Sequence, residues 1–308
     1  MINMLTMNRE RALLAAVAAA AFIALSAPHA KAGFSLGDAS NFGVLYDGSS
    51  STLSMTSATI TGNVGAGGGS VYASGTTVDG DLDFAQSNVH QSHLHSTTVS
   101  GTINYSQSNV SPDLQSMHNL SLSLQSEGGT ILNNIDLNGT GGNYTINASQ
   151  GELDLQGDRV FWIDASNFTF DNGNTITING DAAGDSVVFN ITGGDIAFGG
   201  GIVLNGLDAD QVLFNVADGN NVTIDSNQAM VQGVFLDPTG TMSLDNSVLN
   251  GRFYGGSGGD MTISNSSLID PLPDGGAVPE PSSLALMACA FLGLTVMARG
   301  LPVRAKRA

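Results

Sequence analysis

A short phrase that recurs about every 20 residues constrains the fold of this chain more than any other feature. Residues 57–64 (SATITGNV), 75–82 (GTTVDGDL) and 96–103 (STTVSGTI) are variants of one pattern, and their inner glycines lie 18 and 21 residues apart. A second phrase begins at position 222 (VTIDSN) and returns after 20 and then 19 residues as MSLDNS and MTISNS. Each copy joins a short β-branched run to a turn of Gly, Asn, Asp or Ser.

This period predicts an all-β fold, a right-handed β-solenoid in which each coil consists of a few short strands and apolar side chains stack from coil to coil. Leucine-rich repeats share the period, but their Leu and Asn consensus is missing. An immunoglobulin-like sandwich array is the alternative, because its strands also recur about every 8–12 residues. The repeated phrases and the lack of a Cys, Trp and Cys framework favour the solenoid, with one domain over residues 33–270.

One segment, residues 112–125, departs from the β pattern. Helical spacing is shared by three of its apolar residues, Leu114, Met117 and Leu120. Ser111 and Pro112 fit the N-cap and the first helical position. We therefore expect one amphipathic helix that lies along the solenoid and covers an apolar face. A strand remains the alternative for the end of the segment, because Leu120, Leu122 and Leu124 alternate.

The N-terminal residues 1–32 have the features of a signal peptide. Arg9 and Arg11 precede an apolar stretch over residues 12–25, and Ala30 and Ala32 are small residues at the two positions that signal peptidase reads. We expect cleavage after Ala32. An uncleaved membrane anchor is the alternative, although the polar sequence that follows at once favours cleavage.

The C-terminal residues have the features of a sorting tail. Residues 271–282 form a linker, residues 283–298 an apolar transmembrane segment and residues 299–308 a basic cytoplasmic tail. The linker contains the candidate processing residues Val278, Pro279, Glu280 and Pro281. The apolar run is short for a permanent span, which needs roughly 20 residues, and suits a segment that is held until it is cut.

This order of motif, apolar run and basic tail resembles the PEP-CTERM signal of Gram-negative bacteria. The resemblance implies a transient stay in the inner membrane, processing by an exosortase near the Pro-Glu-Pro motif, and release to the cell surface or extracellular matrix. Signal peptidase and the exosortase would then be the partners of the chain during export.

The chain that remains after processing, residues 33 to about 277, is strongly acidic. Of 27 acidic residues only Glu10 and Glu280 lie outside it, and of nine basic residues only Arg159 and Arg252 lie inside it, which leaves 25 acids and two bases. Nucleic-acid binding requires clustered Lys and Arg and is excluded. A hydrophobic content of 42% in short alternating runs favours a folded chain over a disordered one.

Two acidic patterns are candidates for calcium binding. Asp79, Asp81 and Asp83 alternate on one predicted strand, so their carboxylates would share a face, and calcium takes such oxygen ligands. Acids that merely solvate the surface are the favoured alternative, because the other features of an EF-hand loop are missing. Residues 255–260 (GGSGGD) match a calcium-binding nonapeptide repeat only once, which favours a plain turn.

The remaining polar clusters give no reason to expect an enzyme. His90, His93 and His95 could bind a transition metal, but their polar flanks indicate a surface loop. A lyase for acidic sugars needs basic groups to hold the substrate carboxylate and take the proton, and the processed chain offers only Arg159 and Arg252. A hydrolase needs two carboxylates about 5–10 Å apart, and no pair is marked out. We therefore expect no enzymatic activity and no cofactor except, at most, calcium.

The body has a second, more specific resemblance. Residues 34–45 (FSLGDASNFGVL) and 178–189 (INGDAAGDSVVF) resemble the choice-of-anchor A type of surface domain, which is often joined to a PEP-CTERM tail and regarded as an adhesin. The layout of coils, one helix and further coils is more distantly similar to the bacterial ice-binding β-solenoid family.

These resemblances imply an adhesive or structural protein of the cell surface or biofilm matrix, with an extracellular polysaccharide or another surface ligand as its partner. Ice binding is the alternative, and a polysaccharide-acting enzyme is a third one. Ice binding needs regularly spaced hydroxyl and methyl groups on a flat face. Thr175, Thr177 and Thr223 supply some of these groups, but no long Thr-x-Thr ladder is visible along the chain.

Overall fold

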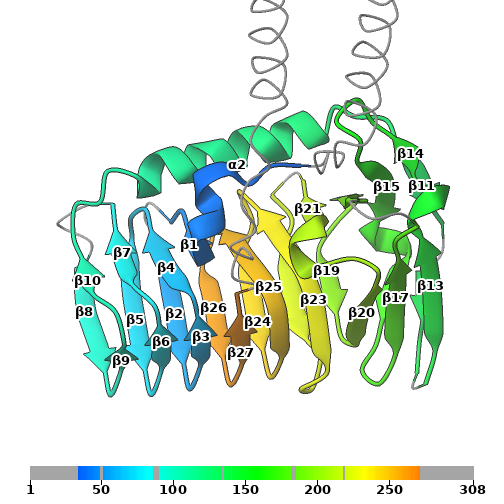
Figure 1. Ribbon diagram of the computed structural model, residues 1–308. Helices are drawn as coiled ribbons and strands as arrows, with labels where there is room; N and C mark the ends of the chain where they lie inside the picture. The colour runs from blue at the N-terminus through cyan, green and yellow to red at the C-terminus, as the bar shows by residue number, and fades with distance from the viewer. Residues whose placement is uncertain are drawn as a thin grey trace, which may run out of the picture. The chain divides into compact units, whose positions relative to one another are not determined.

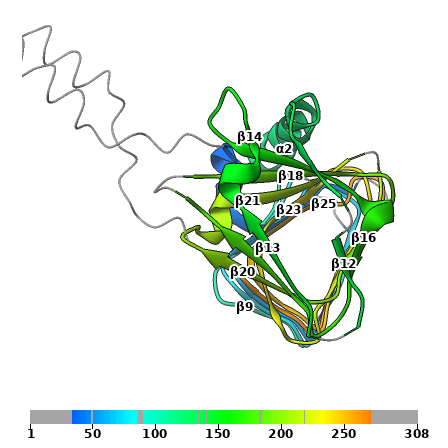
Figure 2. The ribbon, with the colours of Figure 1, turned by 90° about the vertical axis from the view of Figure 1, so that its right-hand side faces the viewer.

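A computed structural model describes residues 34–48, 51–85, 90–133, 135–139, 141–181, 185–217 and 219–270. These residues form a β-solenoid with one flanking helix, as the repeat predicts (Figure 1). Its coils are roughly triangular in cross-section, so the strands form three faces along the solenoid (Figure 2). The predicted signal peptide, linker, membrane segment and basic tail lie outside the described residues. Within the described ranges, no helix has the length and apolar character needed to cross a membrane.

The first face is a sheet of parallel strands. In spatial order it contains β10 (Ile103–Asn104), β7 (Leu82–Phe84), β4 (Asn63–Ala66), β1 (Phe42–Tyr46), β25 (Val248–Gly255), β23 (Met230–Asp237), β21 (Val212–Val216), β18 (Val187–Thr192), β15 (Arg159–Asp164) and β11 (Thr130–Leu132). The short strand β14 (Glu152–Leu153) is antiparallel to β15.

The other two faces are also built from parallel strands. The second face contains β9 (Thr98–Val99), β6 (Thr77–Asp79), β3 (Thr59–Thr61), β27 (Ser267–Ile269), the first halves of β25 and β23, and then β20 (Gly201–Asn205), β17 (Thr175–Asn179) and β13 (Asn143–Asn147). The third contains β8 (His90–His95), β5 (Ser70–Ser74), β2 (Thr52–Thr56), β26 (Met261–Ser264), β24 (Met242–Asp245), β22 (Val222–Asp225), β19 (Ile196–Phe198), β16 (Phe168–Phe170) and β12 (Ile135–Leu137). Four short 3-10 helices occur among the described residues: η1 (Gly37–Asn41), η2 (Ala148–Gln150), η3 (Ala165–Asn167) and η4 (Ala209–Gln211).

The coils are not stacked in the order of the chain. The chain starts in the middle of the solenoid, coils outward to β10, returns along the flank through the helix, and resumes at the opposite end with β11. Its last coil then meets its first, with Leu53 opposite Met261 and Ile60 opposite Leu268. The repeat predicts the coil itself, but not this order.

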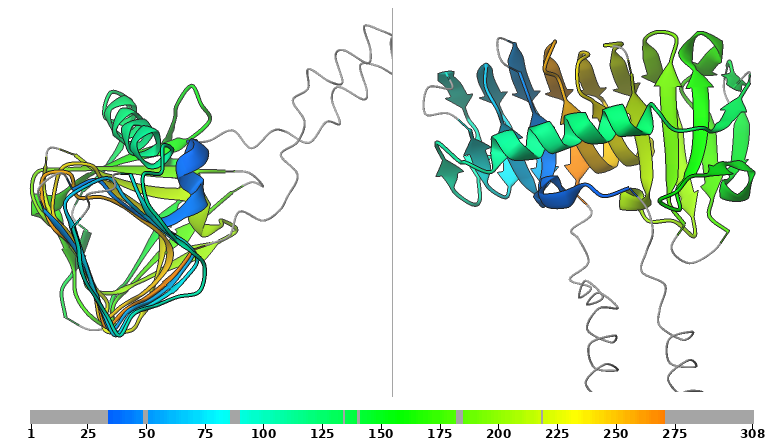
Figure 3. Two further views of the ribbon diagram at one scale, coloured as in Figure 1. Left: turned by 90° about the vertical axis from the view of Figure 1, so that its left-hand side faces the viewer. Right: turned by 90° about the horizontal axis from the view of Figure 1, so that it is seen from above.

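The helix α2 (Val110–Leu124) lies along the outer side of the first face (Figure 3). Its buried side chains, among them Leu114, Met117 and Leu124, form a second core with outward side chains of that face such as Leu213 and Val234. The prediction of a covering helix is confirmed, and the strand alternative is wrong, since Leu122 points away and is 65% exposed. The predicted N-cap Ser111 is also wrong, because the helix begins two residues earlier than expected, after Asn109.

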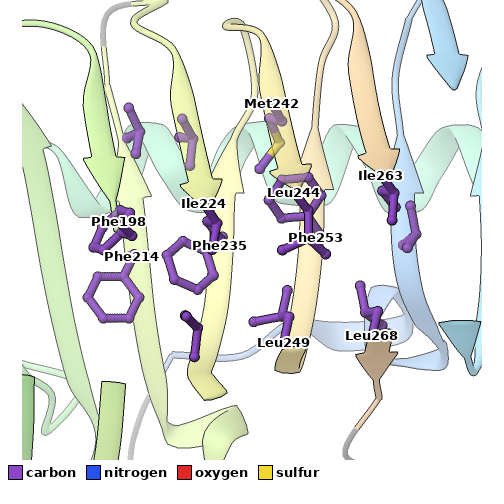
Figure 4. Packing of buried hydrophobic residues seen from close by; sticks show 14 of the residues in the cluster. Phe198, Phe214, Ile224, Phe235, Met242, Leu244, Leu249, Phe253, Ile263 and Leu268 are labelled. Atoms are coloured by element: carbon purple, nitrogen blue, oxygen red, sulfur yellow. The ribbon is translucent and has the colours of Figure 1, made fainter. Parts of the chain in front are cut away.

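The main core fills the inside of the coils with one inward side chain at every second position. Four phenylalanines stack along it, Phe161, Phe189, Phe214 and Phe235, with successive ring centroids 5.4, 5.0 and 4.7 Å apart. Phe253 is the next residue in register and is fully buried (Figure 4). Equivalent positions of successive coils therefore stack in the interior, as the repeat predicts.

Polar ladders hold the coils together at the corners of the triangle. Where the third face turns into the second, Ser226 N–H donates to Ser247 Oγ (2.8 Å) and Ser247 N–H donates to Ser266 Oγ (3.1 Å). The neighbouring asparagines, Asn227, Asn246 and Asn265, have left-handed φ angles of 45–50°. Asparagine tolerates this conformation better than most residues. The serine hydrogen bonds between coils and the left-handed turns explain why Ser and Asn recur together in the second sequence phrase.

Candidate functional site

Two of the three faces are open along their length, whereas α2 lies over most of the first. We call the second face the neutral face, defined by the outward side chains of β9, β6, β3, β27, the first halves of β25 and β23, β20, β17 and β13. Among these described side chains, Asp79 is the one that carries a charge. The chain as a whole has a formal net charge of −18. A flat surface almost free of charge is therefore a distinctive feature of this molecule.

Hydroxyl groups form a row across one end of the neutral face. Thr98, Thr77, Thr59 and Ser267 are in register on four adjacent strands. Adjacent strands lie about 4.8 Å apart, and outward side chains of one strand are about 6.7 Å apart. The side chains therefore form a two-dimensional array with a constant spacing.

Amide groups form a matching row at the other end. Asn179 Nδ2 donates to Asn147 Oδ1 (2.9 Å), and Asn205 Nδ2 donates to Asn179 Oδ1 (2.9 Å). Because each amide orients the next, the row is rigid before any ligand arrives. Thr145 and Thr177 are in register beside it.

The middle of the neutral face exposes several apolar side chains beside the amides of Gln232 and Asn250. Met230, on β23, is 47% exposed and lies in register with the half-buried Val248. Val203 and Ile269, on β20 and β27, are also exposed. Exposed apolar groups between hydroxyl and amide rows bind water weakly, and such a patch commonly marks an interaction surface. The arrangement suits a flat, solid or polymeric ligand rather than a small molecule.

The third face has hydroxyls as well, but its outward side chains include carboxylates. Ser54, Thr262, Ser243 and Thr223 form a row in register. Beside this row, Asp245 accepts hydrogen bonds from Ser243 and Ser264. Asp225 is the next residue in register and is exposed. This face is therefore similar in shape to the neutral face and different in charge.

The threonines noted in the sequence fall on both open faces. Thr175 and Thr177 lie on β17 of the neutral face, whereas Thr223 lies on β22 of the third face. The ladder itself was missed because it runs across coils rather than along one strand. The sequence does contain a pattern that predicts this ladder, because Thr59, Thr77 and Thr98 occupy the same position in the three copies of the first sequence phrase.

The three candidate calcium ligands do not share a strand. Asp79 ends β6 on the neutral face, Asp81 lies at the corner and Asp83 lies in β7 on the first face. The prediction that one strand presents all three is wrong, because the chain turns at Gly80. Burial raises the pKa of Asp83, and a hydrogen bond from Asn104 opposes this effect.

Each of the three carboxylates instead accepts a hydrogen bond from the next coil. The donors are Ser100 Oγ to Asp79 (2.7 Å), Thr102 N–H to Asp81 (2.7 Å) and Asn104 Nδ2 to Asp83 (2.8 Å). Across the described part of the chain, no group of three or more His, Cys, Asp or Glu side chains is arranged to hold a metal ion.

The histidine segment forms strand β8 rather than a loop, and His95 is exposed. The Gly-rich segment at residues 255–260 is the connection between β25 and β26, where Asp260 Oδ1 accepts a hydrogen bond from Thr52 N–H (2.8 Å). The processing residues lie outside the described ranges: Ala30, Ala32, Val278, Pro279, Glu280 and Pro281.

Comparisons with known proteins agree with this architecture. A family model described as "Putative Ice-binding-like adhesive domain" matches residues 30–265. The solved structure of an ice-binding protein from the Antarctic ascomycete Antarctomyces psychrotrophicus is 16% identical, with a TM-score of 0.52, and the match covers 77% of this chain and 98% of that one. A search among curated proteins gave no match.

Two further ice-binding proteins have a similar fold. One, from an Antarctic bacterium of the Flavobacteriaceae, is 18% identical with a TM-score of 0.53, and the match covers 80% of this chain and 49% of that one. The other, from an Arctic yeast, is 16% identical with a TM-score of 0.51, and the match covers 78% of this chain and 94% of that one. At these identities the similarity establishes the fold alone.

Proposed function

Because the chain belongs to the ice-binding-like adhesive domain family, we propose that it is an exported, non-enzymatic adhesive protein whose neutral face binds an ordered solid surface, with ice as the first ligand to test. The observation that carries the proposal is the neutral face, where Asp79 is the one charged side chain among the described outward residues, with its rows of hydroxyl and amide groups. The surface of ice is neutral and periodic, so a nearly neutral, periodic protein surface is its physical counterpart.

The geometry explains how weak contacts could add up to tight adhesion. Each exposed hydroxyl or methyl group contributes little, but the hydroxyl row repeats over four paired strands at a spacing of about 4.8 Å. The side chains are held by parallel strands and, at one end, by the amide row. Because these side chains are already ordered, little conformational entropy is lost when they bind a surface. Three side chains illustrate the row in register: Thr77, Thr59 and Ser267.

We also propose the route by which the protein reaches this surface. Signal peptidase would remove residues 1–32, and a PEP-CTERM-type tail over residues 271–308 would be cut by an exosortase near Pro279, Glu280 and Pro281. The product would be a choice-of-anchor A type adhesin on the surface of a Gram-negative cell or in its biofilm matrix. Adhesion to matrix polysaccharide is accordingly the second candidate function, and the tail is the feature that favours it.

Ice partitioning of residues 31–274 tests the main proposal. Residues Lys31–Asp274 form one compact unit, so this fragment carries the whole solenoid. The informative variant is Thr59→Tyr, which places a bulky ring in the middle of the hydroxyl row on the neutral face. The matched control is Thr223→Tyr, which places the same ring on the third face.

We expect the unmodified fragment to enrich in slowly growing ice and Thr59→Tyr to lose most of this enrichment, while Thr223→Tyr retains it. Failure of the unmodified fragment to enter ice would contradict ice binding and leave adhesion to matrix polysaccharide as the better reading. Equal loss in both variants would contradict the assignment to the neutral face.

A further inference from the structure

The first face is not covered along its full length. Asn190 Nδ2 on β18 donates to Leu124 O (2.8 Å), which places the end of α2 above that strand. The next strands in the sheet, β15 and β11, lie past the helix. An open cavity of about 470 Å³ lies there, within the size range of small-ligand sites.

The apolar part of this cavity is formed by a pair of neighbouring side chains. Ile131 on β11 is in register with Trp162 on β15, and Ile131 is 64% exposed. A Cβ atom at Gly129 would lie 2.6 Å from Trp162 Cδ1. Any side chain at position 129 would therefore push the indole aside, so the local backbone is shaped around the ring.

The polar part consists of amide, carboxylate and hydroxyl groups. Asn133, Asn167, Asp164 and Thr192 line the cavity. Asn167 Nδ2 donates to Asp164 Oδ2 (2.9 Å), and hydrogen bonds from Ser166 lower the pKa of Asp164. Asp164 is therefore a charged acceptor with a fixed orientation.

We propose that this cavity is a second binding site, specific for a neutral pyranose residue of a polysaccharide. The C–H faces of a pyranose ring are apolar and pack on an aromatic ring, while its hydroxyls pair with planar amide and carboxylate groups. Trp162 and Ile131 supply the first kind of contact, and Asn133, Asn167 and Asp164 supply the second.

Charge selects the class of sugar. No Lys or Arg lines this cavity, whereas Asp164 does. An acidic sugar would therefore meet a carboxylate without a compensating base, and a neutral sugar would not. The site lies on the first face, so it is separate from the neutral face and from the proposed binding of ice.

Intrinsic fluorescence tests the proposal directly, because Trp162 is the single tryptophan of the chain. Residues 31–274 are titrated with neutral hexasaccharides of glucose, mannose and N-acetylglucosamine, and with an oligogalacturonate as the acidic probe. We expect a saturable change in emission with at least one neutral hexasaccharide and none with the acidic one. No saturable change with any neutral hexasaccharide, or an equal change with the acidic one, overturns the proposal.

Two asparagine variants keep the fluorophore and locate the site. Asn133→Ala removes an exposed amide from the cavity, and we expect it to weaken binding of the responding sugar about tenfold. Asn143→Ala removes an exposed amide from the neutral face and should leave that affinity unchanged. Equal affinities of both variants and the unmodified fragment overturn the assignment. Asn133→Ala should still enter ice as the unmodified fragment does, which separates this site from the proposed function.

Discussion

At the scale of single residues, the most unusual feature is a cluster of three carboxyl groups near the end of α2, formed by Glu127, Asp154 and Asp158. Asp158 is fully buried, and its Oδ1 accepts hydrogen bonds from Phe34 N–H (3.0 Å) and from the Ser186 hydroxyl. Burial raises the pKa of the nearby Glu127 to about 7, and Asp154 adds to the rise. This cluster ties the start of the described chain to the β14–β15 hairpin.

The raised pKa of Glu127 predicts a pH dependence. The folded chain binds this proton more tightly than the unfolded chain, whose Glu titrates near 4.5, so stability falls as pH rises from about 4.5 to about 7. Glu127→Gln keeps the shape of the protonated carboxyl and does not titrate. We expect its melting temperature to fall less than that of the unmodified fragment between pH 5 and pH 8. Parallel curves for both proteins would show that Glu127 is not protonated in the fold.

A second residue-scale prediction concerns the aromatic stack. Phe253 is fully buried and continues the row that contains Phe235 and Phe214. Replacement of a buried Phe by Ala costs about 3–5 kcal/mol, so Phe253→Ala should clearly lower the free energy of unfolding in urea. Leu155→Ala, at a fully exposed position, is the control. A similar small effect of both variants would place Phe253 outside the core.

At the scale of elements, α2 shows what sequence can and cannot predict. Its existence follows from the spacing of Leu114, Met117 and Leu120, because three such residues can meet a sheet only from a helix. Its first residue does not follow, since Asn109 has a helical conformation and makes no side-chain capping bond. Gly, Asn and Ser predict the turns at the corners, but the alternation of Asp79, Asp81 and Asp83 predicts a continuous strand where the chain in fact bends at Gly80.

Matched leucines of α2 test whether the helix stabilises the first face. Leu114 is buried in the second core, whereas Leu122 is largely exposed on the same helix. We expect Leu114→Ala to lower the free energy of unfolding by about 2–5 kcal/mol and Leu122→Ala to change it by less than about 0.5 kcal/mol. Thermal melts of both variants and of the unmodified fragment measure this difference in stability. Equal losses would mean that α2 contributes through its helicity rather than its packing.

At the scale of the whole molecule, the sequence repeat predicts that the chain forms coils but does not predict the order in which the coils stack. Copies of the repeat resemble one another, so any copy could in principle stack on any other. The contact between Leu53 and Met261 joins the first coil to the last, and no local pattern indicates it. For the same reason the cavity at Trp162 could not be predicted, because it depends on where the chain resumes after α2. The neutral face could have been found by aligning the copies of the first phrase.

The imbalance of 25 acids against two bases predicts a response of the whole molecule to cations. Mutual repulsion of these charges destabilises the compact state, and divalent ions relieve repulsion more effectively than monovalent ions. We expect millimolar calcium to raise the melting temperature of residues 31–274 more than sodium at equal ionic strength. Because Asp79, Asp81 and Asp83 face different directions and bond to the next coil, replacement of all three by Asn should preserve most of this response. Loss of the response would reveal a defined calcium site at that corner, and equal shifts with calcium and sodium would show that the carboxylates interact with cations only through ionic strength.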